Sequence, residues 1–331
     1  MKRAFIVVTG IALLTGAFGL IVRLTTGHAA TSYGSYVPWG LWVSMYIYFI
    51  GLSAGAFLLS TLAYVFRVSW MEKIGPLALF AALVSLIAAL FSIWFDIGHM
   101  GRFYKIFLSP NFKSMMTWMV WLYTAYFILL VVEFALVIRP DWVRWRGMEL
   151  AADVIARDRR VVRILGAVGV PLAVAFHGGV GALFGVVGAR PFWNTGLYPI
   201  MFLISALASG GALLLFVLAF FWPATDPDRG SIAWRLSRLV FGLLLFDALM
   251  LFADYSVGLY GAIPAHAQAI GLVLFGPHAW AFWLVQVLIG LVIPVIIMVH
   301  PRISRQTAWL GVAGALAAFG FTAVRLNIVI P

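Results

Sequence analysis

The sequence predicts an all-α integral membrane protein with about nine transmembrane helices. Three observations lead to this fold class. Of the 331 residues, 64% are hydrophobic and only 10% are charged, whereas a soluble domain is about half apolar and a quarter charged. Apolar stretches of about 20 residues, the length that crosses a bilayer, recur along the whole chain. The lysines and arginines gather in alternate loops. This composition excludes a soluble enzyme, a nucleic-acid-binding domain and a disordered chain.

The apolar stretches define the predicted spans in chain order. We place them at 4–22, 39–66, 76–96, 115–138, 163–187, 197–222, 236–257, 280–299 and 308–328. The first resembles a signal peptide, because Lys2-Arg3 precede an apolar stretch and Ala29-Ala30 follow it. We expect it to be a retained helix.

The cations predict the orientation of these spans. With the N-terminus inside, 16 lysines and arginines fall in inner segments and six in outer segments. The six outer cations are Arg23, Arg102, Lys105, Lys113, Arg190 and Arg325. Because cytoplasmic loops carry the excess of Lys and Arg, we expect a cytoplasmic N-terminus and an outer C-terminus in a bacterial cytoplasmic membrane. The net charge of +11 is then a topology signal rather than a sign of nucleic-acid binding.

An internal duplication predicts two bundles. Residues 40–59 align with residues 196–215, with identical Gly40/Gly196 and Ser53/Ser209 among the matches. Four spans separate the copies, so both units should have the same orientation. We therefore expect an N-terminal helix with its outer loop at 1–36, a first four-helix bundle at 37–190 and a second at 191–331. Small residues in both copies would allow close helix contact, and packing alone is the simpler explanation for them.

Ionisable groups within spans are costly and mark a candidate proton path. Glu133, His177 and Asp247 lie inside predicted spans, and Asp96 and Asp254 lie at outer span ends. A series of Glu133, Asp247, His177 and Asp254 would step across the membrane. The alternative is a set of separate hydrogen-bonded ties between helices.

A polar cluster on the outer side is the candidate redox site. Asp96, His99 and Arg102 are spaced by three, so a continued helix would place them on one face. A histidine paired with a carboxylate can exchange protons near neutral pH, as a quinone headgroup requires. The alternative is a salt bridge between Asp96 and Arg102 at a helix end.

Other cofactor classes fit the sequence poorly. The chain has no cysteine, which excludes thiolate ligation of a metal or an iron–sulfur cluster by this chain. Of six histidines only His177 lies mid-span, so bis-histidine haem is not expected, and no late span contains the lysine that retinal needs. His266 and His278 could ligate a metal but are more simply solvated. Tryptophans at the outer boundaries, Trp39 and Trp193 among them, fit interfacial anchors.

Three motifs resemble the NrfD/PsrC family, the polysulfide-reductase-type integral membrane subunits. They are Pro38-Trp39-Gly40 with Phe49–Ala56, then Asp96-Ile97-Gly98-His99-Met100-Gly101-Arg102-Phe103, and Arg190-Pro191-Phe192-Trp193-Asn194-Thr195 running into Phe202–Ala206. The resemblance extends over residues 36 to 300. It implies two four-helix bundles and a haem-free subunit that binds menaquinone or ubiquinone near the outer face. The implied partners are an iron–sulfur, ferredoxin-like subunit on that face, a molybdopterin subunit or a multihaem cytochrome c, and membrane lipid.

The candidate roles follow from the residues and the resemblance together. We expect Asp96, His99 and His177 to exchange protons with the quinone. Trp39, Arg102, Arg190, Trp193 and Asn194 are the candidate quinone-binding residues, and Glu133, Asp247 and Asp254 the candidate proton path. Some family members have a Tyr ahead of a Gly in the fifth span, where this chain has His177-Gly178.

Two other functions remain open on the sequence alone. A secondary transporter would suit the repeats and Asp247, although the prolines mostly lie near span ends rather than at mid-depth. A purely structural membrane anchor would use the same polar groups as helix ties. Uptake by the isolated chain would favour the transporter, and a complex that cannot use quinols would favour the anchor.

Overall fold

The described residues form helices and loops without a β-strand. The computed structural model describes residues 2–29, 31, 33–34, 39–261 and 263–330, and only the backbone of residues 2–6, 8 and 9. Pro38, and the predicted boundary between residues 36 and 37, lie outside them, as do the side chains of Lys2 and Arg3. The elements are α1 (Lys2–Thr26), α2 (Leu41–Tyr64), α3 (Ser69–Glu72), α4 (Gly75–Asp96), η1 (Met100–Arg102), α5 (Lys105–Leu108), α6 (Met115–Trp145), α7 (Ala152–Gly185), α8 (Tyr198–Phe221), α9 (Arg229–Tyr260), α10 (Pro264–Phe275), η2 (Ala281–Val292), α11 (Ile293–Val299), η3 (Ile303–Arg305) and α12 (Thr307–Val329).

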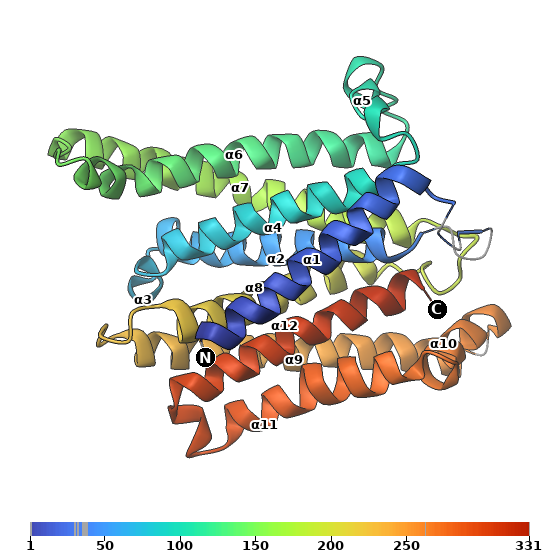
Figure 1. The fold of residues 1–331 in the computed structure, drawn as a ribbon. Helices are drawn as coiled ribbons and strands as arrows, with labels where there is room; N and C mark the ends of the chain where they lie inside the picture. Colours follow the sequence, from blue (N-terminus) through green and yellow to red (C-terminus); the bar gives the residue numbers. More distant parts are fainter. Residues whose placement is uncertain (1, 30, 32, 35–38, 262, 331) are drawn as a thin grey trace.

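The chain is an all-α multi-pass membrane protein. Within the described residues, eight helices are long and apolar enough to cross a membrane. The part of α1 whose side chains are described without a gap, Gly10–Thr26, is a shorter apolar helix, so the ninth span remains a prediction. The long helices lie side by side along one direction (Figure 1). We call the end of the assembly at which α4 terminates the Asp96 end. The opposite end, where Lys73 lies in the turn before α4, is called the Lys73 end.

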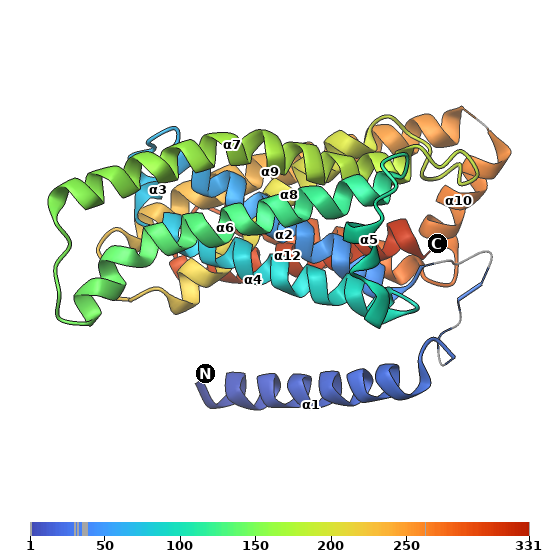
Figure 2. The ribbon, with the colours of Figure 1, turned by 90° about the horizontal axis from the view of Figure 1, so that it is seen from above.

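Three helices extend well beyond their predicted spans at the Lys73 end. α6 continues to Trp145, α7 begins at Ala152 and α9 begins at Arg229. Hydropathy marks only the part of a helix that crosses lipid, whereas arginine and other charged residues with good helix propensity continue the helix into water. The α6–α7 hairpin therefore projects past its neighbours (Figure 2).

The two duplicated helices, α2 and α8, pack against each other in the interior. A Cβ built at Gly55 would lie 1.8 Å from the carbonyl oxygen of Ala206, and one at Gly210 would lie 2.5 Å from the backbone nitrogen of Ala56. Only glycine permits such an approach of two backbones. α4, α6 and α7 pack in a ring with α2, whereas α9, η2, α11 and α12 gather with α8. The division of the chain into two domains remains a prediction.

The helix predicted at 280–299 is irregular. Its first 12 residues, Ala281–Val292, form a π-helix, and α11 follows with Pro294 in its first turn. Proline has no N–H, so it cannot bond to a carbonyl of the preceding turn. Gly290 of the π-helix lies against Gly320 of α12, where an added Cβ would be 2.7 Å from the Gly320 Cα. Hydropathy carries no signal for this change of helix type.

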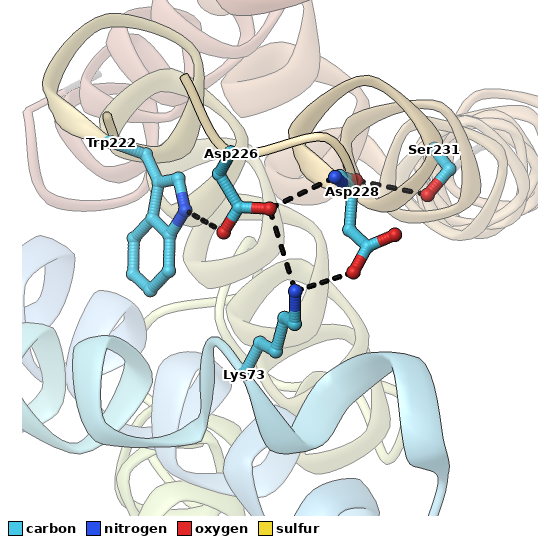
Figure 3. A network of polar contacts seen from close by, with 5 residues as sticks. All are labelled: Lys73, Trp222, Asp226, Asp228 and Ser231. Carbon is cyan, nitrogen blue, oxygen red and sulfur yellow. Dashed lines mark hydrogen bonds and ion pairs between the residues drawn. The ribbon is translucent and has the colours of Figure 1, made fainter. Parts of the chain in front are cut away.

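A polar clasp joins distant parts of the chain at the Lys73 end. The ammonium group of Lys73 donates to Asp226 at 3.4 Å and also to Asp228, both in the loop before α9 (Figure 3). Trp222 donates its indole N–H to Asp226 at 2.9 Å. The hydrogen bond from Trp222, together with the backbone N–H of Asp228 and the charge of Lys73, lowers the pKa of Asp226. The hydrogen bond from Lys73 to Asp228 raises the pKa of Lys73. Both shifts favour the charged forms, the carboxylate of Asp226 and the ammonium of Lys73.

Candidate functional site

Asp96 lies at the end of α4, and the predicted helical stack beyond it does not form. The helix ends at Asp96, Ile97 is extended, and a separate turn of 3-10 helix contains Arg102. Gly98, which has no side chain to stabilise a helix, follows directly. His99 and Arg102 are exposed, and the described residues include no Asp96–Arg102 ion pair. The helix that would place Asp96, His99 and Arg102 on one face is therefore absent, and the alternative, an Asp96–Arg102 salt bridge, does not form within the described residues.

Asp96 instead contacts residues that precede α2. The phenol of Tyr33 donates to Oδ1 of Asp96 at 2.9 Å. Partial burial, together with the adjacent Asp96 charge, raises the pKa of Tyr33. Arg23, near the end of α1, donates to the carbonyls of Phe95 and Ile97 at 2.7 and 3.1 Å. No sequence pattern connects these residues, because 63 positions separate Tyr33 from Asp96.

An aromatic cluster gathers several of the predicted quinone-binding residues at the same end. Trp39 and Trp193 stack with ring centroids 5.4 Å apart, and Phe184 contacts both edge-on. The guanidinium of Arg190 lies over the Trp193 ring at 5.7 Å. Trp193 is 5% exposed and donates to the Ile328 carbonyl at 2.6 Å, so it is a packed side chain and not an interfacial anchor. Asn194 is exposed.

His177 lies deeper, where α2, α7, α8 and α12 meet. It is fully buried, and its Nε2 is 2.8 Å from the Phe202 carbonyl, whereas its Nδ1 has no partner within the described chain. A Cβ added to Gly51 would be 3.6 Å from both His177 and Arg325, so these two side chains converge on α2. His177 therefore belongs to a polar cluster between the duplicated halves rather than to the Asp96 end.

Arg325 lies in the interior, contrary to its predicted place in an outer segment. It stands within α12 and is 2% exposed. Its guanidinium donates to the Ser205 hydroxyl and lies 4.5 Å from the Phe202 ring centroid. It lies within the predicted span 308–328 but close to the outer end of that span, and for that reason the sequence places it with the outer cations.

Asp247 faces Arg325 across a small polar cavity. Both residues line a cavity of about 20 Å³ together with Tyr198, Ser205 and Gln286. A second cavity, of about 40 Å³, is lined by residues of α9, η2 and α12 and shares Asp247, Leu251, Gln286 and Val324 with the first. The two charges interact electrostatically. The smaller cavity has room for one or two water molecules and the larger for about three, since one water needs about 10–15 Å³ of such space and polar partners.

The remaining predicted proton-path residues lie apart from this pair. Asp254, 5% exposed, accepts from the Thr195 hydroxyl at 3.3 Å near the Asp96 end. Glu133 is fully buried among α2, α6 and α7, and neither oxygen has a partner in the described chain. In the described structure, Glu133 and Asp247 make no contact.

Buried tyrosines are polar residues of the interior that the sequence patterns did not single out. Tyr126 donates to the Ser53 carbonyl at 3.2 Å, and the hydroxyls of Tyr46 and Tyr123 hydrogen-bond each other. These three tyrosines and Ser53 lie on α2 and α6. The same two helices carry Tyr64 and Glu133, which interact electrostatically. Tyrosines three positions apart within an apolar span, as at Tyr123 and Tyr126, are a sequence signal that could identify these buried hydroxyl groups.

Comparisons with known proteins agree with the motifs. The family model described as Polysulphide reductase, NrfD matches residues 30–331. A selenate reductase subunit of Mesobacillus selenatarsenatis is 35% identical, and the alignment covers 100% of this chain and 82% of that protein. The Hdr-like menaquinol oxidoreductase integral membrane subunit of Archaeoglobus fulgidus is 32% identical, and the alignment covers 89% of this chain and 71% of that protein. The menaquinone reductase integral membrane subunit of Nitratidesulfovibrio vulgaris is 25% identical over 93% and 75%. The chain therefore belongs to the NrfD family of polysulphide-reductase-type membrane proteins.

Proposed function

We propose that this chain is the quinone-binding membrane subunit of a respiratory oxidoreductase complex, and that it oxidises or reduces menaquinone or ubiquinone at the Asp96 end. The observation that carries the proposal is the half-buried carboxylate of Asp96, held by Tyr33 at the end of a span. A headgroup there would have a proton-exchanging carboxylate and, just before the start of α2, the aromatic surface of Trp39. Two of the relatives carry menaquinone or menaquinol in their names.

The charges support an outward-facing Asp96 end. Of the six cations assigned to outer segments, Arg325 is buried in α12, which leaves five against the 16 inner cations. Removing Arg325 from the outer count enlarges the excess of inner over outer cations, which is the pattern expected when Lys-rich and Arg-rich loops lie in the cytoplasm. We place the N-terminus in the cytoplasm of a bacterial cell and the C-terminus outside.

The loop after Asp96 supports a partner on the outer face. Residues 97–114 contain Arg102, Lys105 and Lys113, all exposed, and no acidic residue. The same loop exposes Phe103, Phe107 and Leu108, and α5 stands out from the helices (Figure 1). Exposed apolar side chains with unopposed cations fit an acidic protein surface. The proposed partner is an iron–sulfur subunit of the ferredoxin type, joined to a molybdopterin subunit or a multihaem cytochrome c, because this chain has no cysteine to hold a cluster.

In the proposed reaction the chain's residues bind the headgroup and exchange its protons, while the partner takes or supplies the electrons. Asp96, in its ionised form, accepts a proton from a bound quinol hydroxyl, and in its protonated form returns one to a bound quinone. His99 and Arg102 lie on the exposed loop, so their contribution would be contact with the partner or with solvent. His177 and Arg325 lie too deep between the bundles to be reached from the Asp96 end without a further polar group.

The first test replaces Asp96 by asparagine. We expect the complex purified through this chain to lose menadiol oxidation or menadione reduction by on the order of 100-fold, because general acid–base catalysis contributes about that much or more. The partner subunits should still co-purify. Asp141→Asn, an exposed carboxylate in α6 at the Lys73 end, is the matched control. Normal turnover in Asp96→Asn would remove the assignment.

A second test addresses a proton path. If protons cross the membrane through the second half of the chain, Asp247→Asn should lower the number of protons moved per electron while electron transfer continues at half its rate or more. The reason is that Asp247 lines both cavities at mid-span, about two helical turns along α9 from Asp254. The ratio can be measured with a pH-sensitive dye in proteoliposomes driven by menadiol. An unchanged ratio would exclude Asp247 from the path.

A further inference from the structure

The end of α4 is held by two residues that come before α2, Arg23 and Tyr33. Arg23, 7% exposed, donates from Nε and Nη2 to the carbonyls of Phe95 and Ile97, the residues on either side of Asp96. The last carbonyls of a helix have no partner within it, and a cation at this terminus also interacts favourably with the helix dipole. Arg23 therefore fixes the backbone position of Asp96.

Tyr33 fixes the side chain of Asp96 in turn. Its phenol donates to Oδ1 at 2.9 Å, and the described residues provide no partner for Oδ2. The ring reaches this position because residue 40 is glycine: a Cβ there would be 2.5 Å from Cε1 of Tyr33. One carboxylate oxygen is thereby held, and the other is left for a ligand or water.

His28 completes the group of charged and titratable residues that face Asp96. Its ring meets the Tyr33 ring edge-on, with centroids 5.3 Å apart, and its Nε2 is buried without a partner in the described chain. The groups that interact electrostatically with Asp96 are thus Arg23, His28 and Tyr33. The exposed His99, which the spacing of the motif pairs with Asp96, is not among them.

We propose that Tyr33 is a positioning residue of the quinone site, which orients the Asp96 carboxylate so that Oδ2 points toward the exchanging proton of the headgroup. This inference depends on the proposed function of Asp96. It gives the N-terminal helix a role in the site, because Arg23 at the end of α1 holds the backbone on which Asp96 stands. The histidine that interacts electrostatically with this carboxylate is His28.

The experiment removes one oxygen atom by Tyr33→Phe and measures the pH dependence of menadiol oxidation in the purified complex. A hydrogen bond to a carboxylate favours its ionised form, so its loss should move the acid limb of the rate profile to higher pH by about half a unit or more. We expect kcat/KM to fall about tenfold. Rates are expressed per mole of assembled complex, so a lower yield does not affect them. Tyr260→Phe, at a tyrosine that is 94% exposed, should behave as wild type.

The outcomes separate this inference from the proposed function. A wild-type pH profile in Tyr33→Phe, together with an inactive Asp96→Asn, overturns the role of Tyr33 and leaves the function of Asp96 in place. Full activity in Asp96→Asn overturns the proposed function itself. Arg23→Met provides a second measurement: it should also lower kcat/KM, and Arg23→Lys should restore part of it, because a lysine can still donate to the carbonyls at the end of α4.

Discussion

Replacing Gly55 by alanine should disturb the packing of α2 against α8 and lower the thermal stability of the protein. The added Cβ would lie 1.8 Å from the carbonyl oxygen of Ala206 and 2.5 Å from its carbonyl carbon. Both are backbone atoms, so no side-chain rotation can relieve the contact and the two helices must separate. Overpacking of this kind costs about 1–3 kcal/mol or more, whereas the gain in helix propensity from glycine to alanine is at most about 1 kcal/mol.

The consequence should be visible as a lower melting temperature. With a net cost of about 2 kcal/mol and a shift of about 2–4 °C per kcal/mol in a chain of this size class, we expect a fall of about 4–8 °C. The measurement is thermal unfolding of the detergent-purified chain, with the yield of monodisperse protein beside it. Gly242→Ala is the control, because Gly242 also lies in a long helix, α9, but has open space around its Cβ position. Equal behaviour of the two variants would contradict the close approach of α2 and α8.

The positions of the spans could be predicted from the sequence because lipid imposes a length and a polarity on each of them. Predicted spans 39–66, 76–96, 197–222 and 308–328 agree with α2, α4, α8 and α12 to within two residues. The helix ends in water could not be predicted in this way. α6 continues past Pro140 to Trp145, and α10 occupies part of what was expected to be an outer loop, because hydropathy does not report on helices outside the bilayer.

The candidate site could be predicted less well, for a different physical reason. Residue types identify Asp96, Asp247 and Glu133 as costly groups, since burying a carboxylate demands a partner. The partners come from other helices and loops: Tyr33 reaches Asp96, and Arg325 faces Asp247. Such pairs depend on helix packing, which one sequence does not contain. Trp39 and Trp193 were expected in one site only because both match the family motifs, and the structure brings their rings together.

Arg325→Met should be the most damaging single substitution in the second half of the chain. Arg325 is 2% exposed, donates to Ser205 and lies on the face of Phe202. Methionine fills much of the same volume, but it leaves Asp247 beside the cavity without its cation. Loss of one partner of a buried contacting charge pair typically costs about 3–5 kcal/mol, and for Arg325 and Asp247, which share a cavity without a direct ion pair in the described structure, the cost should be at or below that range. We therefore expect the yield of folded protein to fall at least tenfold, measured as the monodisperse fraction after detergent extraction.

The pairing itself is tested by restoring neutrality. In Arg325→Met with Asp247→Asn, the uncompensated carboxylate is gone, and replacing both members of a buried pair is often nearly neutral for stability. The double variant should therefore recover most of the folded protein that the single variant loses, although not proton movement. Arg305→Met, at an exposed arginine of the Lys73 end, should have no effect on yield. If the double variant is as depleted as Arg325→Met alone, the damage comes from the lost contacts to Ser205 and Phe202, and Asp247 is not the partner of Arg325.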